Sequence, residues 1–210
     1  MSERGHFIVI EGLEGAGKST ALTTVKRFLN HHNQEYISTR EPGGTRVGET
    51  VRTLVKEVVQ DEPLDPRAEL LLFYAARVQL VEQVIRPALD RGCWVLADRF
   101  ELSTMAYQGG GRALDEDMIR HLSQFCLESL QPDLTIFLDV TPEKGLERAN
   151  MRGKMDRIEQ ESLDFFTRVY SQYHKHIKEM QNVEIIDASK PLVVVQSTIR
   201  ATLEAYFKVS

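Results

Sequence analysis

The stretch FIVIEGLEGAGKST, Phe7 to Thr20, joins an apolar, β-branched run to a glycine-rich turn and the start of a helical pattern. Residues 12–19 match the spacing GxxxxGK(S/T) and lie where that motif requires, after a predicted strand (6–10) and before a predicted helix (18–30). Glycines at these positions let backbone N–H groups converge on phosphate oxygens, and the helix N-terminus adds partial positive charge. The stretch therefore predicts a phosphate-binding loop; the alternative is a glycine-rich turn without a ligand.

Short apolar runs alternate with longer amphipathic runs along the rest of the chain. This alternation favours a parallel sheet with helices on both faces. We expect a three-layer P-loop α/β fold with five parallel strands, as one domain over residues 1–210, in which Pro87 kinks the end of a long central helix. The further strands are expected over 35–39, 93–97, 133–140 and 183–188, and the further helices over 46–60, 65–91, 115–130, 163–180 and 191–206, with one more starting at 142.

The composition of the 210 residues limits the possible partners. The formal net charge is −5, which argues against a general nucleic-acid-binding surface. The two cysteines, Cys93 and Cys126, have no metal-ligand spacing, so we expect reduced core thiols and a cytoplasmic protein. No run approaches the roughly 20 apolar residues of a membrane span, and we expect neither a membrane partner nor a secretion signal.

The segment DRFELS follows the predicted strand 93–97, and ligands of parallel sheets bind beyond the carboxyl ends of the strands. Asp98 is suited to hold Mg²⁺ directly or through its waters, together with the hydroxyl of Ser19. Arg99 offers a planar fork for a phosphate, and Lys18 can reach the outer phosphates of a nucleotide. The alternative for Asp98 and Arg99 is a surface ion pair that orders the strand end.

The central helix carries a possible base site in LFYAARVQL. Phe73 and Arg77 are four residues apart and share a face, so a ring could stack on a base while the guanidinium donates to a base carbonyl. The alternative is a core aromatic residue, with the arginine paired to Glu69 or Glu82.

The segment AYQGGGR, residues 106–112, brings Tyr107 and Gln108 next to three glycines. A ring and an amide suit a nucleoside pocket, and glycines allow close backbone approach. The alternative is a flexible turn.

A charged segment near residues 148–160 contains polar residues, a glycine and dense positive charge, which suit a mobile lid over a triphosphate. The alternative is a solvated helix face with i,i+4 pairs to Glu147 and Glu159. The basic residues are Arg148, Arg152, Lys154 and Arg157.

These motifs occur in one order together with TREPGGT, PDLTIFLDV and DRIEQE, and from about residue 6 to 190 the chain resembles the bacterial thymidylate kinases with a type II lid. The resemblance implies an enzyme that transfers the γ-phosphate of ATP to dTMP, with Mg²⁺ as cofactor and a homodimer as the assembly. The phosphate loop is shared by many families, whereas REPGGT, FYAAR and AYQG are far more specific.

The resemblance also implies residue roles. Lys18, Arg99 and the lid residue Arg152 are the expected catalytic cations. Ser19 and Asp98 are expected to hold the metal ion, and residues 187–191 (DASKP) are expected to pass beside the adenine of ATP. Phe73 is expected to stack on thymine and Arg77 to bond its O4. The ATP-binding set is Gly12, Leu13, Glu14, Gly15, Ala16, Gly17, Lys18, Ser19 and Thr20; the dTMP-binding set is Glu14, Phe73, Arg77, Arg99, Ser103, Tyr107 and Gln108.

Glu14 is an acid inside a loop that binds anions. We expect it to accept a hydrogen bond from the sugar 3′-hydroxyl of dTMP; the alternative is an ion pair with an arginine such as Arg99. Because Gly15 follows it and carries no charge, the missing cation would come from Arg152 of the lid.

The chemistry agrees with electrostatic catalysis, because a phosphate monoester is already largely anionic at neutral pH and needs no general base. The closest rival is another P-loop small-molecule kinase, acting on a nucleoside or a different nucleoside monophosphate. A regulatory GTPase is disfavoured because DASKP stands where an NKxD motif is expected, and a nucleic-acid-dependent ATPase is disfavoured by the charge.

Overall fold

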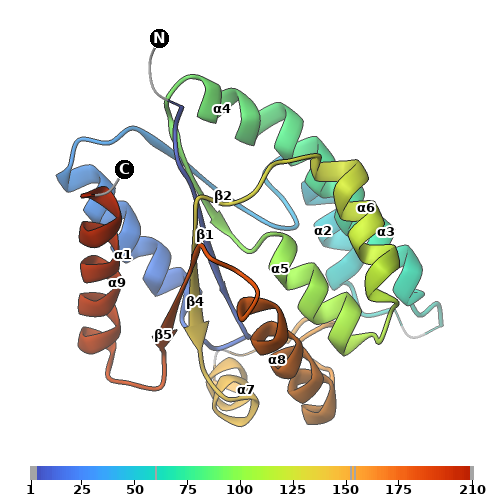
Figure 1. Ribbon diagram of the computed structural model, residues 1–210. Coiled ribbons are helices and arrows are strands. Elements are labelled where there is room, and N and C mark those ends of the chain that lie inside the picture. Colours follow the sequence, from blue (N-terminus) through green and yellow to red (C-terminus); the bar gives the residue numbers. More distant parts are fainter. Residues whose placement is uncertain (1–3, 60, 152, 154, 209–210) are drawn as a thin grey trace.

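A single parallel sheet forms the centre of the protein, with helices on both faces (Figure 1). The computed structural model describes residues 4–59, 61–151, 153 and 155–208. The five strands lie in the order β2-β3-β1-β4-β5, and every neighbouring pair is parallel, which confirms the expected fold class. Their bounds are β1 Phe7–Gly12, β2 Tyr36–Arg40, β3 Trp94–Asp98, β4 Leu134–Asp139 and β5 Val183–Asp187.

The central strand β1 is buried along its whole length, and its side chains alternate between two cores. Phe7 and Val9 belong to a cluster with Ile85 of the central helix, whereas Ile8 and Ile10 belong to another cluster. Successive residues of a strand point to opposite faces, so an unbroken apolar run suits a strand that is covered on both sides. This is why FIVI takes the centre of the sheet.

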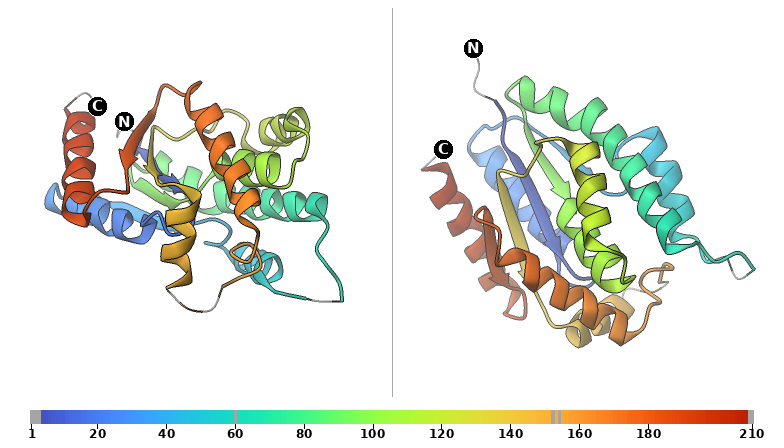
Figure 2. Two further views of the ribbon diagram at one scale, coloured as in Figure 1. Left: turned by 90° about the horizontal axis from the view of Figure 1, so that it is seen from below. Right: turned by 45° about the vertical axis from the view of Figure 1, so that its right-hand side comes forward.

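The helices are α1 Lys18–His31, α2 Arg46–Lys56, α3 Pro66–Leu80, α4 Arg86–Asp90, α5 Glu101–Thr104, α6 Glu116–Leu127, α7 Pro142–Asn150, α8 Leu163–Ile177 and α9 Leu192–Phe207, with π-helical turns η1 Val81–Ile85 and η2 Met105–Gly111. Helices α1 and α9 lie side by side on one face of the sheet, and α3, α4 and α6 lie on the other (Figures 1 and 2).

The long central helix expected over 65–91 is interrupted just before Pro87. The N–H of Arg86 bonds the carbonyl of Val81, five residues back, so one π-helical turn separates α3 from α4. Proline lacks an N–H and crowds the preceding turn of a helix, which accounts for the interruption at this place.

Residues 106–111 of the segment AYQGGGR are helical, which is against the alternative of a flexible turn. Its glycines lie against α8, because a Cβ on Gly110 would come 2.7 Å from Cβ of Gln172, and one on Gly111 would come 2.5 Å from the ring of Phe165. The glycines therefore allow close packing of η2 on α8 rather than motion.

The sheet register brings three loops to one edge. Asp98 of β3 lies level with Ile10 of β1 and with Arg40 of β2. The phosphate loop, the turn after β2 and the segment after β3 therefore leave the sheet side by side, at the edge where ligands of such folds bind.

Candidate active site

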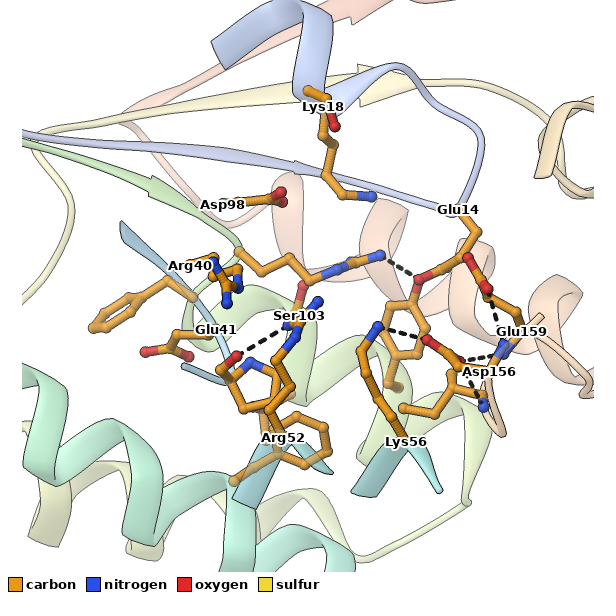
Figure 3. Close-up of a pocket in the computed structure, with 18 of the residues that line it drawn as sticks. Glu14, Lys18, Arg40, Glu41, Arg52, Lys56, Asp98, Ser103, Asp156 and Glu159 are labelled. Carbon is orange, nitrogen blue, oxygen red and sulfur yellow. Dashed lines mark hydrogen bonds and ion pairs between the residues drawn. The ribbon is translucent and has the colours of Figure 1, made fainter. Parts of the chain in front are cut away.

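A cavity of about 420 Å³ opens at this edge of the sheet (Figure 3). The phosphate loop, the turn after β2, α2, α3 and the segment after β3 contribute its walls, and described residues of the charged segment complete them. The lining residues are Glu14, Gly15, Gly17, Lys18, Ser19, Thr20, Arg40, Glu41, Pro42, Arg52, Lys56, Phe73, Arg77, Asp98, Arg99, Phe100, Ser103, Thr104, Tyr107, Gln108, Arg148, Asp156, Ile158 and Glu159.

The phosphate loop has the backbone that its glycines allow. Gly12, Gly15 and Gly17 have φ of 141°, 71° and 95°, a region that side chains disfavour. The Nζ of Lys18 donates to the carbonyls of Gly12 and Leu13, at 3.0 and 2.8 Å. Burial, and then the charge of Arg99, lower the pKa of Lys18 to about 8. The loop thus holds a half-buried lysine at the start of α1, and this lysine lines the cavity.

Glu14 forms the ion pair that the sequence left as the alternative. Its Oε1 accepts from Nη2 of Arg99 at 2.6 Å, and its Oε2 accepts from the hydroxyl of Tyr107. Burial raises the pKa of Glu14, but the charges of Arg99 and Lys18 outweigh it and hold that pKa below its usual value. Glu14 is therefore an ionised carboxylate whose two oxygens are held by Arg99 and Tyr107 at the wall of the cavity.

Arg99 is held by a second carboxylate, Glu11, which the sequence reasoning missed. Nη1 of Arg99 donates to the hydroxyls of Ser103 and Tyr173, at 3.0 and 3.1 Å. Both hydroxyls donate in turn to Oε2 of Glu11, at 2.6 and 2.9 Å, and Oε1 of Glu11 accepts from the N–H of Phe100. An acid in the otherwise apolar strand FIVIEG was the signal that could have found it.

Asp98 lines the cavity with an acceptor that a bound cation could match. Its Oδ1 is buried and has no hydrogen-bond partner among the described residues, and an unmatched buried acceptor is costly unless a ligand supplies a donor or a cation. Figure 3 shows its carboxylate near Lys18. No cluster of three or more His, Cys, Asp or Glu suited to a metal exists within the described part of the chain, so the remaining ligands would have to come from bound phosphates and water.

Phe73 and Arg77 both line the cavity, and Arg77 is 1% exposed. Neither Glu69 nor Glu82 is its partner, contrary to the alternative from the sequence. Its Nε donates to Glu41 at 2.7 Å and its Nη1 to Glu101 at 2.6 Å. Burial raises the pKa of Glu41 to about 7, against the opposing charge of Arg77. These carboxylates hold the guanidinium in one orientation at the wall of the cavity.

Ser103, Tyr107 and Gln108, which were expected in a nucleoside pocket, also line the cavity. They do so from α5 and η2, because the helical segment turns these side chains inward. The ring of Tyr107 lies under the guanidinium of Arg99, 4.8 Å from its centre.

The charged segment is only partly at the cavity. Arg148 lines it and donates to the carbonyl of Ala188 at 2.9 Å. Arg157 instead donates to the carbonyl of Val55 and pairs with Glu69 of α3, so it is not the solvated i,i+4 partner that the alternative required. Arg152 and Lys154 lie outside the described residues.

Three further cations, Arg40, Arg52 and Lys56, line the cavity and were missed by the sequence reasoning. Nη1 of Arg52 donates to the carbonyl of Pro42 at 3.0 Å, and Nζ of Lys56 pairs with Asp156 at 2.6 Å. Arg52 and Lys56 are four apart on α2, a spacing that indicates a shared face and could have found them. The cavity therefore has more positive charge than the phosphate loop alone supplies.

Comparison with known proteins matches this arrangement to one family. The family model described as Thymidylate kinase matches residues 10–199. The chain is similar to Thymidylate kinase of Legionella pneumophila (strain Corby), with 55% identity over 204 residues that cover 97% of this chain and 96% of the relative. It is also similar to Thymidylate kinase of Legionella pneumophila (strain Paris), with 54% identity over the same shares.

Proposed function

The chain belongs to the thymidylate kinase family and phosphorylates dTMP to dTDP with ATP as donor; we propose that it does so in the cavity of Figure 3, by positioning and electrostatics alone. The supporting observation is that basic side chains from several segments line one cavity. Lys18 of the phosphate loop and Arg99 of the acceptor side line it together with the α2 cations.

In this proposal the donor phosphates lie on the backbone N–H groups of the loop, with Lys18 on the outer phosphates. Arg99 holds the phosphate of dTMP, and Glu14 accepts from its sugar 3′-hydroxyl. Ser103 and Tyr107 border the nucleoside. Such an arrangement brings two anions into line and offsets the charge that grows on the transferring group. Arg152 stays a candidate for a further catalytic cation, on the family resemblance alone.

Thymine would lie between Phe73 and the polar group of Arg77 and Gln108. The ring offers a stacking face, and the locked guanidinium offers N–H donors to the carbonyl at position 4. No proton needs to leave the acceptor phosphate at neutral pH, because its second pKa is near 6.

Mg²⁺ is part of the proposal as cofactor. Ser19 and Asp98 would hold it, directly or through water, and the unmatched Oδ1 of Asp98 supports this role. When bound, the ion would offset the negative charge of the donor phosphates.

The protein is further proposed to be a homodimer that works in the cytoplasm. Leu71 of α3, with Met118 and Phe125 of α6, leave apolar side chains exposed on two helices in mutual contact. A face of this kind on a soluble enzyme suits a second copy of the chain. Cys93 and Cys126 are free thiols, as expected in a reducing compartment. Across the described residues, no helix combines the length and the apolar character needed to cross a bilayer.

An acceptor panel tests the proposal. ADP release is measured with dTMP, dUMP, dCMP and thymidine at equal concentrations, with ATP and Mg²⁺ in excess. The expected result is that dTMP has the highest kcat/KM and that thymidine, whose hydroxyl needs a base to remove its proton, is not turned over. A preference for thymidine would show a nucleoside kinase instead.

A further inference from the structure

Glu69 lies one helical turn before Phe73 on α3 and is 1% exposed. Its carboxylate links α3 to η2 with the following Arg112, and to the segment that contains Arg157. Oε1 accepts from Nε2 of Gln108 at 2.7 Å and from Nε of Arg112 at 3.2 Å, and Oε2 accepts from Nη2 of Arg112 and from Arg157. Gln108 is thus the only neutral partner of this carboxylate among the described residues, and it is also the partner that lines the cavity.

The carboxylate determines which end of the Gln108 amide faces the cavity. An ionised carboxylate has only acceptors, whereas a glutamine amide has a donor end and an acceptor end. The NH₂ group of Gln108 must therefore turn toward Glu69. Its Oε1 has no hydrogen-bond partner among the described residues and belongs to a side chain that lines the cavity. Gln108 consequently presents a hydrogen-bond acceptor, its carbonyl oxygen, to the cavity.

Glu69 stays ionised where it lies. Burial raises its pKa, but hydrogen bonds and charge from Arg112, with further hydrogen bonds from Arg157 and Gln108, outweigh burial and leave the pKa below its usual value. No carboxyl proton is then present that could donate to the amide oxygen and reverse the orientation of Gln108.

We propose that Glu69 is a specificity-determining positioning residue: it holds Gln108 so that its carbonyl accepts a hydrogen bond from a base with an N3–H group. The inference rests on the proposed function and deepens it. Thymine and uracil carry a donor at N3, whereas cytosine carries an acceptor there, so a fixed acceptor selects 4-oxo pyrimidines. A site built to hydrogen-bond a substrate discriminates strongly against an analogue that leaves a buried group unmatched.

The variant Glu69→Gln tests this polarity. In this variant Arg112 and Arg157 continue to donate to residue 69, so the carbonyl oxygen of the new amide turns toward them. The NH₂ group of the new amide then turns toward Gln108. Gln108 then accepts that hydrogen bond and turns its own NH₂ to the cavity, where it suits N3 of cytosine. The expected result is a rise of about tenfold in kcat/KM for dCMP relative to dTMP.

Two comparisons separate a changed orientation of the Gln108 amide from a general loss of folded structure. The ratio of kcat/KM for dUMP to that for dTMP should stay unchanged in Glu69→Gln, because both bases carry N3–H. Arg112→Gln removes two hydrogen bonds from the same carboxylate but leaves it charged, so it should lower the melting temperature and keep the dCMP-to-dTMP ratio of the wild type. An unchanged dCMP-to-dTMP ratio in folded Glu69→Gln would overturn the inference.

A substrate analogue covers the case in which Glu69→Gln does not fold. The wild-type enzyme is assayed with the 3-deaza analogue of dTMP, in which C–H replaces N3–H. The expected loss in kcat/KM is about tenfold or more, and equal use of the analogue would overturn the inference. A wild-type enzyme that does not phosphorylate dTMP at all would instead overturn the proposed function, so the two failures are distinct.

Discussion

The carboxylate of Glu14 lies 2.6 Å from the guanidinium of Arg99, although the two residues are 85 positions apart in the chain. Glu14 belongs to the loop proposed to bind the donor phosphates, and Arg99 belongs to the side of the cavity proposed to bind the acceptor. The pair joins these two parts of the cavity wall and keeps the guanidinium of Arg99 matched by a carboxylate.

The variant Glu14→Gln should impair the use of dTMP more than the use of ATP. The donor loop acts through its backbone N–H groups, which the substitution leaves in place, whereas Arg99 loses its charged partner and the sugar loses a charged acceptor. We expect kcat/KM for dTMP to fall about 10- to 100-fold and KM for ATP to change by less than about threefold. Initial rates with each substrate varied in turn measure both.

Tyr107→Phe is the matched control for Glu14→Gln. It removes the hydroxyl that donates to the other oxygen of Glu14 but keeps the charge pair. Its effect on dTMP should be smaller than that of Glu14→Gln. A larger effect of Glu14→Gln on ATP than on dTMP would contradict the acceptor-side role of Glu14.

Productive capture of ATP should weaken as the pH rises through about 8, the lowered pKa of Lys18. A lysine is charged below its pKa, so the cation that meets the phosphates is present below this pH and lost above it. The pH profile of kcat/KM for ATP between about 7 and 10 reports groups of the free enzyme and should show this limb. An arginine at position 18 stays charged over that range, so kcat/KM for ATP of the Lys18→Arg variant should not fall between about pH 7 and 10. A profile for the wild type that stays flat to pH 10 would contradict the assignment.

Gly111→Ala should destabilise the fold, because the added Cβ would come 2.5 Å from two ring atoms of Phe165. We expect a loss of about 1–3 kcal/mol in the free energy of unfolding, as for other overpacked cores. Gly109→Ala is the control within the same turn, because its Cβ would have its nearest contact at 3.5 Å, with Cδ1 of Ile119, which is an ordinary distance. Thermal unfolding of both variants measures the difference. Equal melting temperatures would show that η2 is not closely packed on α8.

Phe125→Glu should convert the proposed dimer to monomers. Phe125 is 83% exposed on α6, and a charge there would be buried without a partner in a dimer formed through this face. Val193→Glu is the matched control, because Val193 is 67% exposed on α9, away from α3 and α6. Sedimentation equilibrium at several concentrations measures the mass of each. A wild type that sediments as a monomer would rule out the homodimer.

Much of the fold could be predicted because its signals are local. The three central strands β1, β3 and β4 are short apolar runs, and the alternation of strands with helices indicates a parallel sheet with two covered faces. The segment AYQGGGR shows the limit of such signals, because glycine suits both a turn and a close helix contact. The choice depends on α8, whose Phe165 and Gln172 lie more than fifty residues further along the chain.

Three features of the cavity could be inferred from the order of residues alone, because each depends on neighbours within one or two turns: the glycine-rich loop, the strand end at Asp98 and Arg99, and the face shared by Phe73 and Arg77. Which acid meets which cation depends on the folded chain. Arg77 pairs with Glu41 and Glu101 rather than with Glu69. Glu69 is left to orient Gln108, 39 residues away. Ion pairs of buried groups depend on distances in space and on the exclusion of water. The order of residues along the chain specifies neither quantity directly.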